Sequence, residues 1–123
     1  VIFSENSVDV YNPKVVRSTT GSIFHLPVAL GVNLEATIAA AKQAGYQVCA
    51  ATAGGTTLPE LEQSILAKPT LWMFGNEAWG FEPHILELAD LQVAVPIYGA
   101  AESLNLATAA SICLYATAFA QNR

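Results

Sequence analysis

An apolar run in the middle of the chain, residues 46–53, limits the possible folds more than any other stretch. A continuous run of this kind is typical of a strand that is buried on both faces in a parallel sheet. Two more short apolar runs, residues 70–74 and 91–95, follow it with helix-like segments in between. Because strands that alternate with helices form parallel sheets, the sequence predicts an α/β fold, a parallel sheet with helices on both faces.

Start signals for helices, either an N-capping side chain or a proline at the first helical position, recur along the chain. They predict helices at residues 13–20, 34–44, 59–67 and 83–89. Two further strands are expected near the start, at residues 1–3 and around 26–30. Residues 52–57 are small and are expected to form a loop.

Composition excludes several classes of protein. The chain is 53% hydrophobic and 12% charged, which excludes disorder and fits a sheet covered on both faces or a surface buried in a partner. A net charge of −5 is unlike that of a free-standing nucleic-acid binder. No apolar run is long enough to span a membrane. Cys49 and Cys113 lack metal-ligand spacing, so we expect buried free thiols, no metal and a reducing, cytoplasmic location.

The 123 residues correspond to a single domain, residues 1–123. The first residues, Val1-Ile2-Phe3, lie inside an expected strand and no methionine precedes them. We therefore expect a fragment of a longer polypeptide, without a signal peptide.

Residues 95–115 combine a short apolar run with a turn at Gly99, a polar cluster and then an apolar helix. Ser103 is expected to be the N-cap of this helix, whose residues are apolar almost all round, so the helix is expected to be buried. Polar residues gathered at the start of a buried helix add little to stability, which favours a functional role. A capped core helix without such a role remains the alternative.

Three expected loops leave strands at the carboxyl edge of the sheet, where ligands bind in open α/β folds. They are residues 52–57, 75–80 and 98–105, and each is rich in glycine or alanine. None carries a GxGxxG fingerprint or a P-loop, so a phosphate-binding loop is not supported. Glu77 lies in the second loop, and for this residue alone a solvated surface turn is an equally good interpretation.

The residues GNEAWGF, followed by VPIYGAAESLNLATAASICLY, resemble motifs two and three of the SpoU/TrmH-type RNA 2′-O-ribose methyltransferases. The upstream NPKVVRSTTGSIFHLPV is similar to the segment after motif one, so the resemblance covers nearly the whole chain in the same order. It implies a catalytic domain with a C-terminal trefoil knot that uses S-adenosylmethionine and needs no metal. It also implies a homodimer with the active site at its interface, and ribosomal or transfer RNA as partner.

The resemblance assigns roles to matching positions of this chain. Polar motif residues near the reacting groups would be Glu77, Ser103 and Asn105. The methyl donor would be held at Thr52, Ala53, Gly54, Gly75, Val95, Ile97 and Leu104. Lys14 and Arg17 would contact RNA phosphate, although a solvated helix face is the favoured interpretation of these two residues.

Motif one of the family supplies an asparagine and a catalytic arginine upstream of the first strand seen here. We therefore expect that this arginine is missing, that Arg17 does not replace it, and that the fragment binds the donor yet is inactive. A non-catalytic binding or dimerisation module of the same fold is the alternative. A receiver-like signalling domain is disfavoured because Glu5, Asp9 and Asp90 form no acidic cluster at strand ends.

Overall fold

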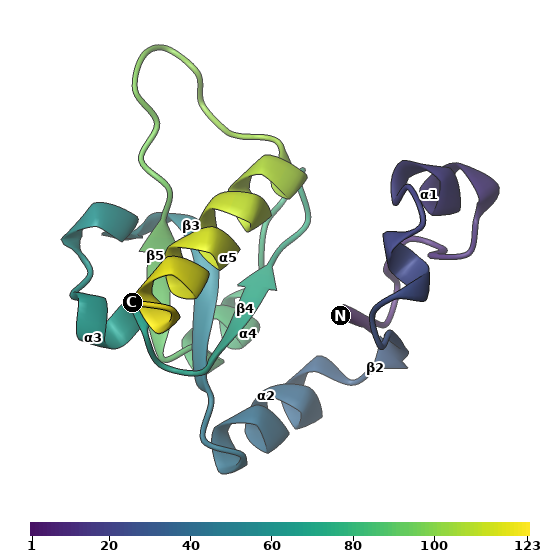
Figure 1. Cartoon of the computed structure of the whole chain (residues 1–123), viewed down its shortest axis with the longest axis horizontal. Helices are drawn as coiled ribbons and strands as arrows, with labels where there is room; N and C mark the ends of the chain where they lie inside the picture. Colours follow the sequence, from purple (N-terminus) through teal and green to yellow (C-terminus); the bar gives the residue numbers. More distant parts are fainter. The chain divides into compact units, whose positions relative to one another are not determined.

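The computed structural model describes residues 1–123 as two compact units, Val1–Thr37 and Ile38–Arg123 (Figure 1). The boundary between the units falls inside helix α2 (Leu34–Gln43). The single domain expected from the sequence stays a prediction.

The first unit is built on a pair of short parallel strands, β1 (Ile2–Ser4) and β2 (Ala29–Val32). Between them lie helix α1 (Pro13–Ser18) and the 3-10 turn η1 (Ser22–Phe24). The predicted cap of α1 is confirmed, because Asn12 Oδ1 accepts a hydrogen bond from the Lys14 amide at 2.9 Å. The strand expected around residues 26–30 begins later, at Ala29, because Pro27 has no N–H to donate to a neighbouring strand.

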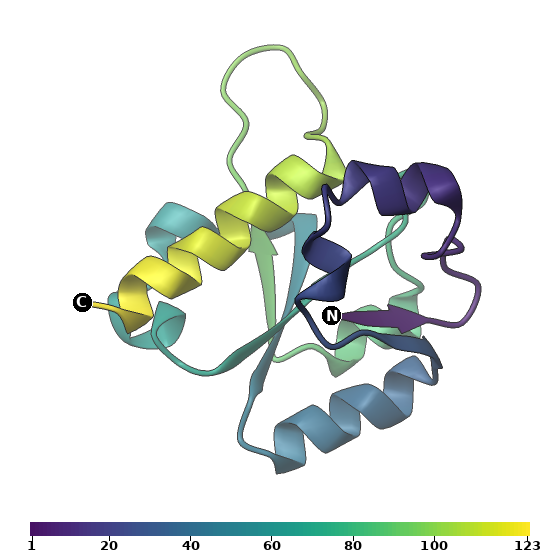
Figure 2. The same cartoon turned by 45° about the vertical axis from the view of Figure 1, so that its right-hand side comes forward.

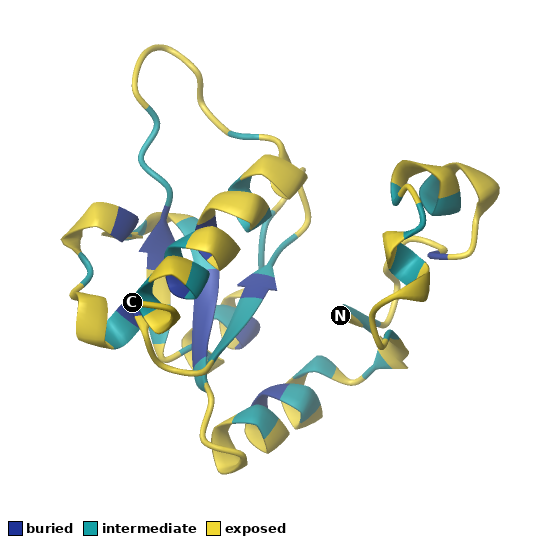
Figure 3. Ribbon diagram, viewed as in Figure 1, coloured by how far each residue is buried: buried dark blue, intermediate teal, exposed yellow.

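The second unit is built on a parallel sheet in the order β4-β3-β5. The central strand is β3 (Gln47–Thr57), with β4 (Thr70–Phe74) and β5 (Leu91–Ala94) on either side. Three successive β3 residues, Val48, Cys49 and Ala50, are at most 2% exposed, and Figure 3 shows dark blue along the central strand of the sheet. The predicted parallel α/β sheet with a buried central strand is confirmed.

Residues 52–57 were expected to be a loop, and this prediction was wrong. They continue β3, but with a bulge, because Ala51 and Thr56 both face Val93 of β5. The bulge is compatible only with a very small residue at its end. A Cβ atom at Gly55 would lie 2.3 Å from the carbonyl carbon of Gln92.

Helices cover both faces of this sheet. Helices α3 (Gln63–Leu66) and α5 (Leu106–Gln121) lie on one face, over a core made of Cys49, Leu58, Leu66, Val93 and Cys113. Side chains alternate along a strand, so Val48, Ala50 and Met73 face the opposite side, where they too are buried. Figures 1 and 2 place α4 (Pro83–Leu88) behind the sheet and α5 in front of it.

The single helix expected at residues 59–67 is interrupted. A 3-10 turn, η2 (Leu58–Glu60), is separated from α3 by Leu61 and Glu62, whose backbone is extended. A capping box stabilises this turn, because Glu60 Oε2 accepts hydrogen bonds from both the amide and the hydroxyl of Thr57.

Helix α5 is not buried all round, contrary to the expectation from its apolar composition. Only Cys113 and Thr117 are buried, whereas the rings of Tyr115 and Phe119 are 62% and 64% exposed. The physical reason is that one sheet face covers only one stripe of a helix. The outward stripe of α5 is therefore an exposed apolar surface in this chain.

The two cysteines are free and buried, as predicted. Burial raises the pKa of each thiol to about 11, so both stay protonated near neutral pH. The residues form no group of side chains suited to hold a metal ion, and no helix is long and apolar enough to cross a membrane.

We predict that Gly55→Ala lowers the free energy of unfolding by about 3 kcal/mol, because the added methyl meets rigid backbone of β5. Gly54→Ala is the matched control, since nothing lies within 4 Å of a Cβ at that position. Urea unfolding followed by circular dichroism measures both variants. Equal stability of the two variants would contradict the close approach of β3 and β5.

Candidate functional site

Three segments leave the sheet of the second unit at its carboxyl edge. The last paired residues of β3 and β4 are Ala51 and Phe74, so Thr52 and Gly75 follow them at the same edge. Val95 follows the end of β5 beside them. The parallel register therefore brings together three of the segments that the sequence singled out.

The loop after β4 is a tight turn held by its own backbone. Asn76 and Gly80 form an antiparallel bridge with N···O distances of 3.0 and 2.8 Å, and Asn76 Oδ1 accepts from the Ala78 amide at 2.8 Å. A Cβ atom at Gly75 would lie 2.7 Å from the carbonyl carbon of Gly80, so the turn closes only with glycine at position 75. The turn leaves Glu77 exposed near its tip.

The connection from β5 to α5 projects beyond the sheet in both views of Figures 1 and 2 and ends at Asn105. Asn105, rather than Ser103, is the N-cap of α5, so the predicted cap was wrong. Its Oδ1 accepts from the amides of Ala107 and Thr108 at 3.0 and 3.3 Å. Ser103 lies two residues too early for its hydroxyl to replace Asn105, and its side chain is exposed.

Glu77 connects the two motif segments. Its Oε1 accepts a hydrogen bond from the Leu106 amide at 3.4 Å, next to the cap that Asn105 forms. A carboxylate is favourable here, because the first amides of a helix lack partners within the helix and carry partial positive charge. The structure thus brings Glu77 and Asn105 to the same helix end.

The residues expected to hold a methyl donor differ in exposure. Gly75, Val95, Ile97 and Leu104 are half-buried, as is Thr52, whereas Ala53 and Gly54 are exposed in the bulge of β3. Half-buried apolar side chains next to accessible backbone suit a small ligand with a flat apolar part.

Lys14 and Arg17 are exposed on α1, one turn apart. They belong to the first unit, and their contact with RNA stays a prediction.

Sequence reasoning missed other features of this edge. The amide of Leu106 gives the helix end its donor, and Asn76 shapes the turn that presents Glu77. Trp79 and Tyr98 are 65% and 87% exposed on the loops after β4 and β5. Their sequence pattern, a large aromatic residue in a loop of otherwise small residues, could have pointed to these two positions.

The comparisons with known proteins agree on one family. The profile of the SpoU rRNA Methylase family matches residues 1–115. The chain belongs to this family.

Similar enzymes of the SpoU family come from several bacteria. The chain is 38% identical over 116 residues to the 23S rRNA (guanosine(2553)-2′-O)-methyltransferase of Bacillus subtilis, covering 94% of this chain and 45% of that protein. A crystal structure of the SpoU methyltransferase AviRb from Streptomyces viridochromogenes, in complex with the cofactor AdoMet, superimposes with a TM-score of 0.79. It is 34% identical, and the match covers 94% of this chain and 47% of that one.

An AdoMet-bound rRNA methyltransferase from Sinorhizobium meliloti superimposes with a TM-score of 0.83 at 32% identity. That match covers 94% of this chain and 44% of the other. The chain therefore spans a little under half the length of each of these three relatives.

We predict that Asn105→Ala lowers the free energy of unfolding by about 1 kcal/mol, because it removes the cap of α5. Ser103→Ala serves as the control and is expected to change stability by less than about 0.5 kcal/mol. Thermal and urea unfolding measure both. A larger loss for Ser103→Ala would mean that the helix begins earlier than the structure places it.

Proposed function

We propose that this chain is the catalytic domain of an S-adenosylmethionine-dependent methyltransferase that modifies the 2′-hydroxyl of a ribose in ribosomal or transfer RNA. The observation that carries the proposal is the meeting of Glu77 and Asn105 at the start of α5, beside the carboxyl edge of the sheet. The relatives from Bacillus subtilis and Sinorhizobium meliloti support it, because both are named as methyltransferases of ribosomal RNA.

The residues at this edge fit the donor. Gly54 has nothing within 4 Å of an added Cβ, so a flat ring has access to the backbone of the β3 bulge. On the loops after β4 and β5, Gly75, Val95, Ile97 and Leu104 add half-buried backbone and apolar surface. We therefore place the donor between these three segments, with Thr52, Ala53 and Gly54 as one wall. When bound, S-adenosylmethionine supplies an activated methyl group on a sulfonium.

The side chains at the start of α5 retain hydrogen-bonding capacity for a ribose. Asn105 uses Oδ1 for the cap, which leaves its Nδ2 as a donor. Glu77 uses Oε1 toward Leu106, which leaves Oε2 as an acceptor, and the Ser103 hydroxyl is exposed nearby in sequence. A donor and an acceptor fixed at one helix end orient a hydroxyl for in-line attack, and orientation is a large part of catalysis when the methyl group is already activated.

RNA is the partner that we propose, in the cytoplasm, with Lys14 and Arg17 on α1 as contacts to phosphate. Both side chains are exposed on one helix. The chain has only five lysine and arginine residues, so few other side chains are available to bind phosphate. The proposal also keeps the C-terminal trefoil knot and the homodimer that the family resemblance implies. The exposed apolar stripe of α5 supports the dimer, since such a patch favours association. No observation favours a non-catalytic module over the enzyme.

We predict that the chain binds S-adenosylhomocysteine saturably, and that Leu104→Trp lowers its affinity at least about tenfold by adding bulk at a half-buried position of the proposed donor site. Leu88→Trp is the matched control, because Leu88 is 36% exposed at the end of α4, before β5 begins. Isothermal titration calorimetry measures all three proteins.

Unchanged affinity in Leu104→Trp would place the donor elsewhere. Absence of binding by the folded chain itself would contradict the proposed donor site. Equal losses in both tryptophan variants would indicate a general disturbance of the fold rather than a blocked site.

We further predict that Phe119→Glu converts a dimer of the chain into a monomer, because it places a charge in the exposed apolar stripe. The Phe119 ring lies 5.5 Å from that of Tyr115, so the charge falls inside an aromatic pair. Ala39→Glu, at an exposed position of α2, is the control and should leave the mass unchanged. Sedimentation equilibrium reads the mass, and a monomeric unmodified chain would refute the dimer.

A further inference from the structure

Helix α5 is attached to β4 and its flanking residues at three places. Near its end, Gln121 Nε2 donates to the Lys68 carbonyl at 3.0 Å, and in its second half Thr117 Oγ1 accepts from Trp72 Nε1 at 2.9 Å. At its start, the Leu106 amide donates to Glu77 at 3.4 Å. From Lys68 through Trp72 to Glu77 the residue numbers increase, whereas those of their partners on α5 decrease from Gln121 through Thr117 to Leu106. The helix therefore runs antiparallel to the strand.

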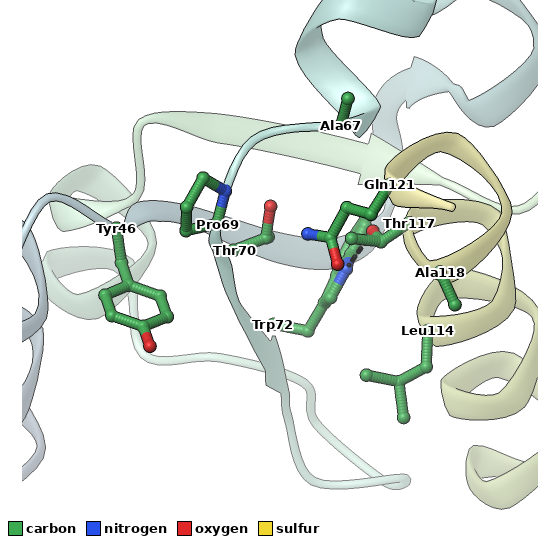
Figure 4. A pocket seen from close by; sticks show the side chains of 9 residues that line it. All are labelled: Tyr46, Ala67, Pro69, Thr70, Trp72, Leu114, Thr117, Ala118 and Gln121. Carbon is green, nitrogen blue, oxygen red and sulfur yellow. Dashed lines mark hydrogen bonds between the residues drawn. The ribbon is translucent and has the colours of Figure 1, made fainter. Parts of the chain in front are cut away.

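The middle contact is the least exposed of the three. Thr117 is the buried polar residue of the core, at 8% exposure, and Trp72 is half-buried against Phe74, with ring centroids 6.4 Å apart. The contacts at the two ends are exposed. Figure 4 shows the indole N–H directed at the Thr117 hydroxyl, in the wall of a cavity of about 510 Å³. A partly buried hydrogen bond of this kind is costly to break, because both groups then lose their partner.

The rest of the buried face of α5 does little to fix the helix along its axis. Ala116 and Ala120, which pack against the core, are small, and the buried Cys113 is only slightly larger. Small side chains interlock little with the sheet and so hardly oppose a shift of α5 along its axis. A hydrogen bond opposes such a shift because it has a defined direction and length. A slip of one helical turn is about 5.4 Å, which is enough to separate the Leu106 amide from Glu77.

We propose that Trp72 and Thr117 are a positioning pair for the donor site. Their hydrogen bond fixes α5 along β4, so that the start of the helix meets Glu77. Trp72 also lies three residues before Gly75, so the same bond holds the strand from which the Gly75 turn emerges. This inference rests on the proposed donor-binding function, and it assigns to two residues outside the site the task of aligning its motif segments.

Thr117→Val tests the pair, because valine keeps the shape of threonine and cannot accept the indole N–H. Thr117→Ser keeps the hydroxyl, and Trp72→Phe keeps an aromatic ring without the donor. We expect Thr117→Val and Trp72→Phe to weaken S-adenosylhomocysteine binding about tenfold each, and Thr117→Ser to stay within about twofold of the unmodified chain. The double variant Trp72→Phe/Thr117→Val should lose no more than either single change, since one bond is removed in all three.

Ile85→Val controls for lost stability. Ile85 is buried on α4, on the other face of the sheet, so its truncation destabilises the fold without touching α5. Unchanged affinity in Ile85→Val, together with the loss in Thr117→Val, would support positioning. Equal losses in the two variants, or normal binding by Thr117→Val, would overturn it.

Amide hydrogen exchange separates this inference from the proposed function, because it requires no donor. In Thr117→Val the amides of residues 106–109 should exchange at least about fivefold faster, whereas in Ile85→Val their rates relative to the core should be unchanged. Accelerated exchange in a chain that does not bind S-adenosylhomocysteine would refute the donor site and leave the alignment intact. Unchanged exchange at the start of α5 would overturn the alignment itself.

Discussion

The second unit depends on the parallel pairing of β3 with a strand on each side. Because the strands are parallel, all three carboxyl ends fall at one edge, and every segment with a proposed role in donor binding leaves from that edge. Burial of β3 on both faces makes this arrangement stable, since shifting the strand would expose apolar side chains on one face or the other. The bulge before Gly55 then turns the end of the central strand into accessible backbone without breaking the sheet.

Local rules of sequence predicted the parts of this fold that depend on neighbours in the chain. The bounds of β4 and the cap of α1 follow from an apolar run and from an asparagine before a proline. The end of β3 could not be predicted in this way, because residues 52–57 are small and loop-like, and only their pairing with β5 makes them a strand. That pairing joins residues about 40 positions apart, which no local pattern encodes.

The candidate site, too, combines features that follow from local sequence with features that depend on distant parts of the chain. Ser103 and Asn105 are both good capping residues. Which of them caps α5 depends on the path of the connection from β5, which brings Asn105 to the residue before the helix. A joint role of these residues with Glu77 was expected only from a family resemblance, whereas the structure shows Glu77 in contact with the Leu106 amide, beside the cap formed by Asn105. Apolar composition predicted a buried α5, but composition cannot tell the face of a helix that packs on the sheet from the face that stays exposed.

The attachment of α5 at both ends has a thermodynamic consequence. A ligand that binds only when the start of the helix is ordered also opposes fraying at its far end, since the helix is held as one piece between Glu77 and Lys68. Binding energy is thereby linked to the local unfolding equilibrium of the last 16 residues of regular structure. A donor bound at the proposed site should accordingly raise the melting temperature of the second unit as its free concentration rises.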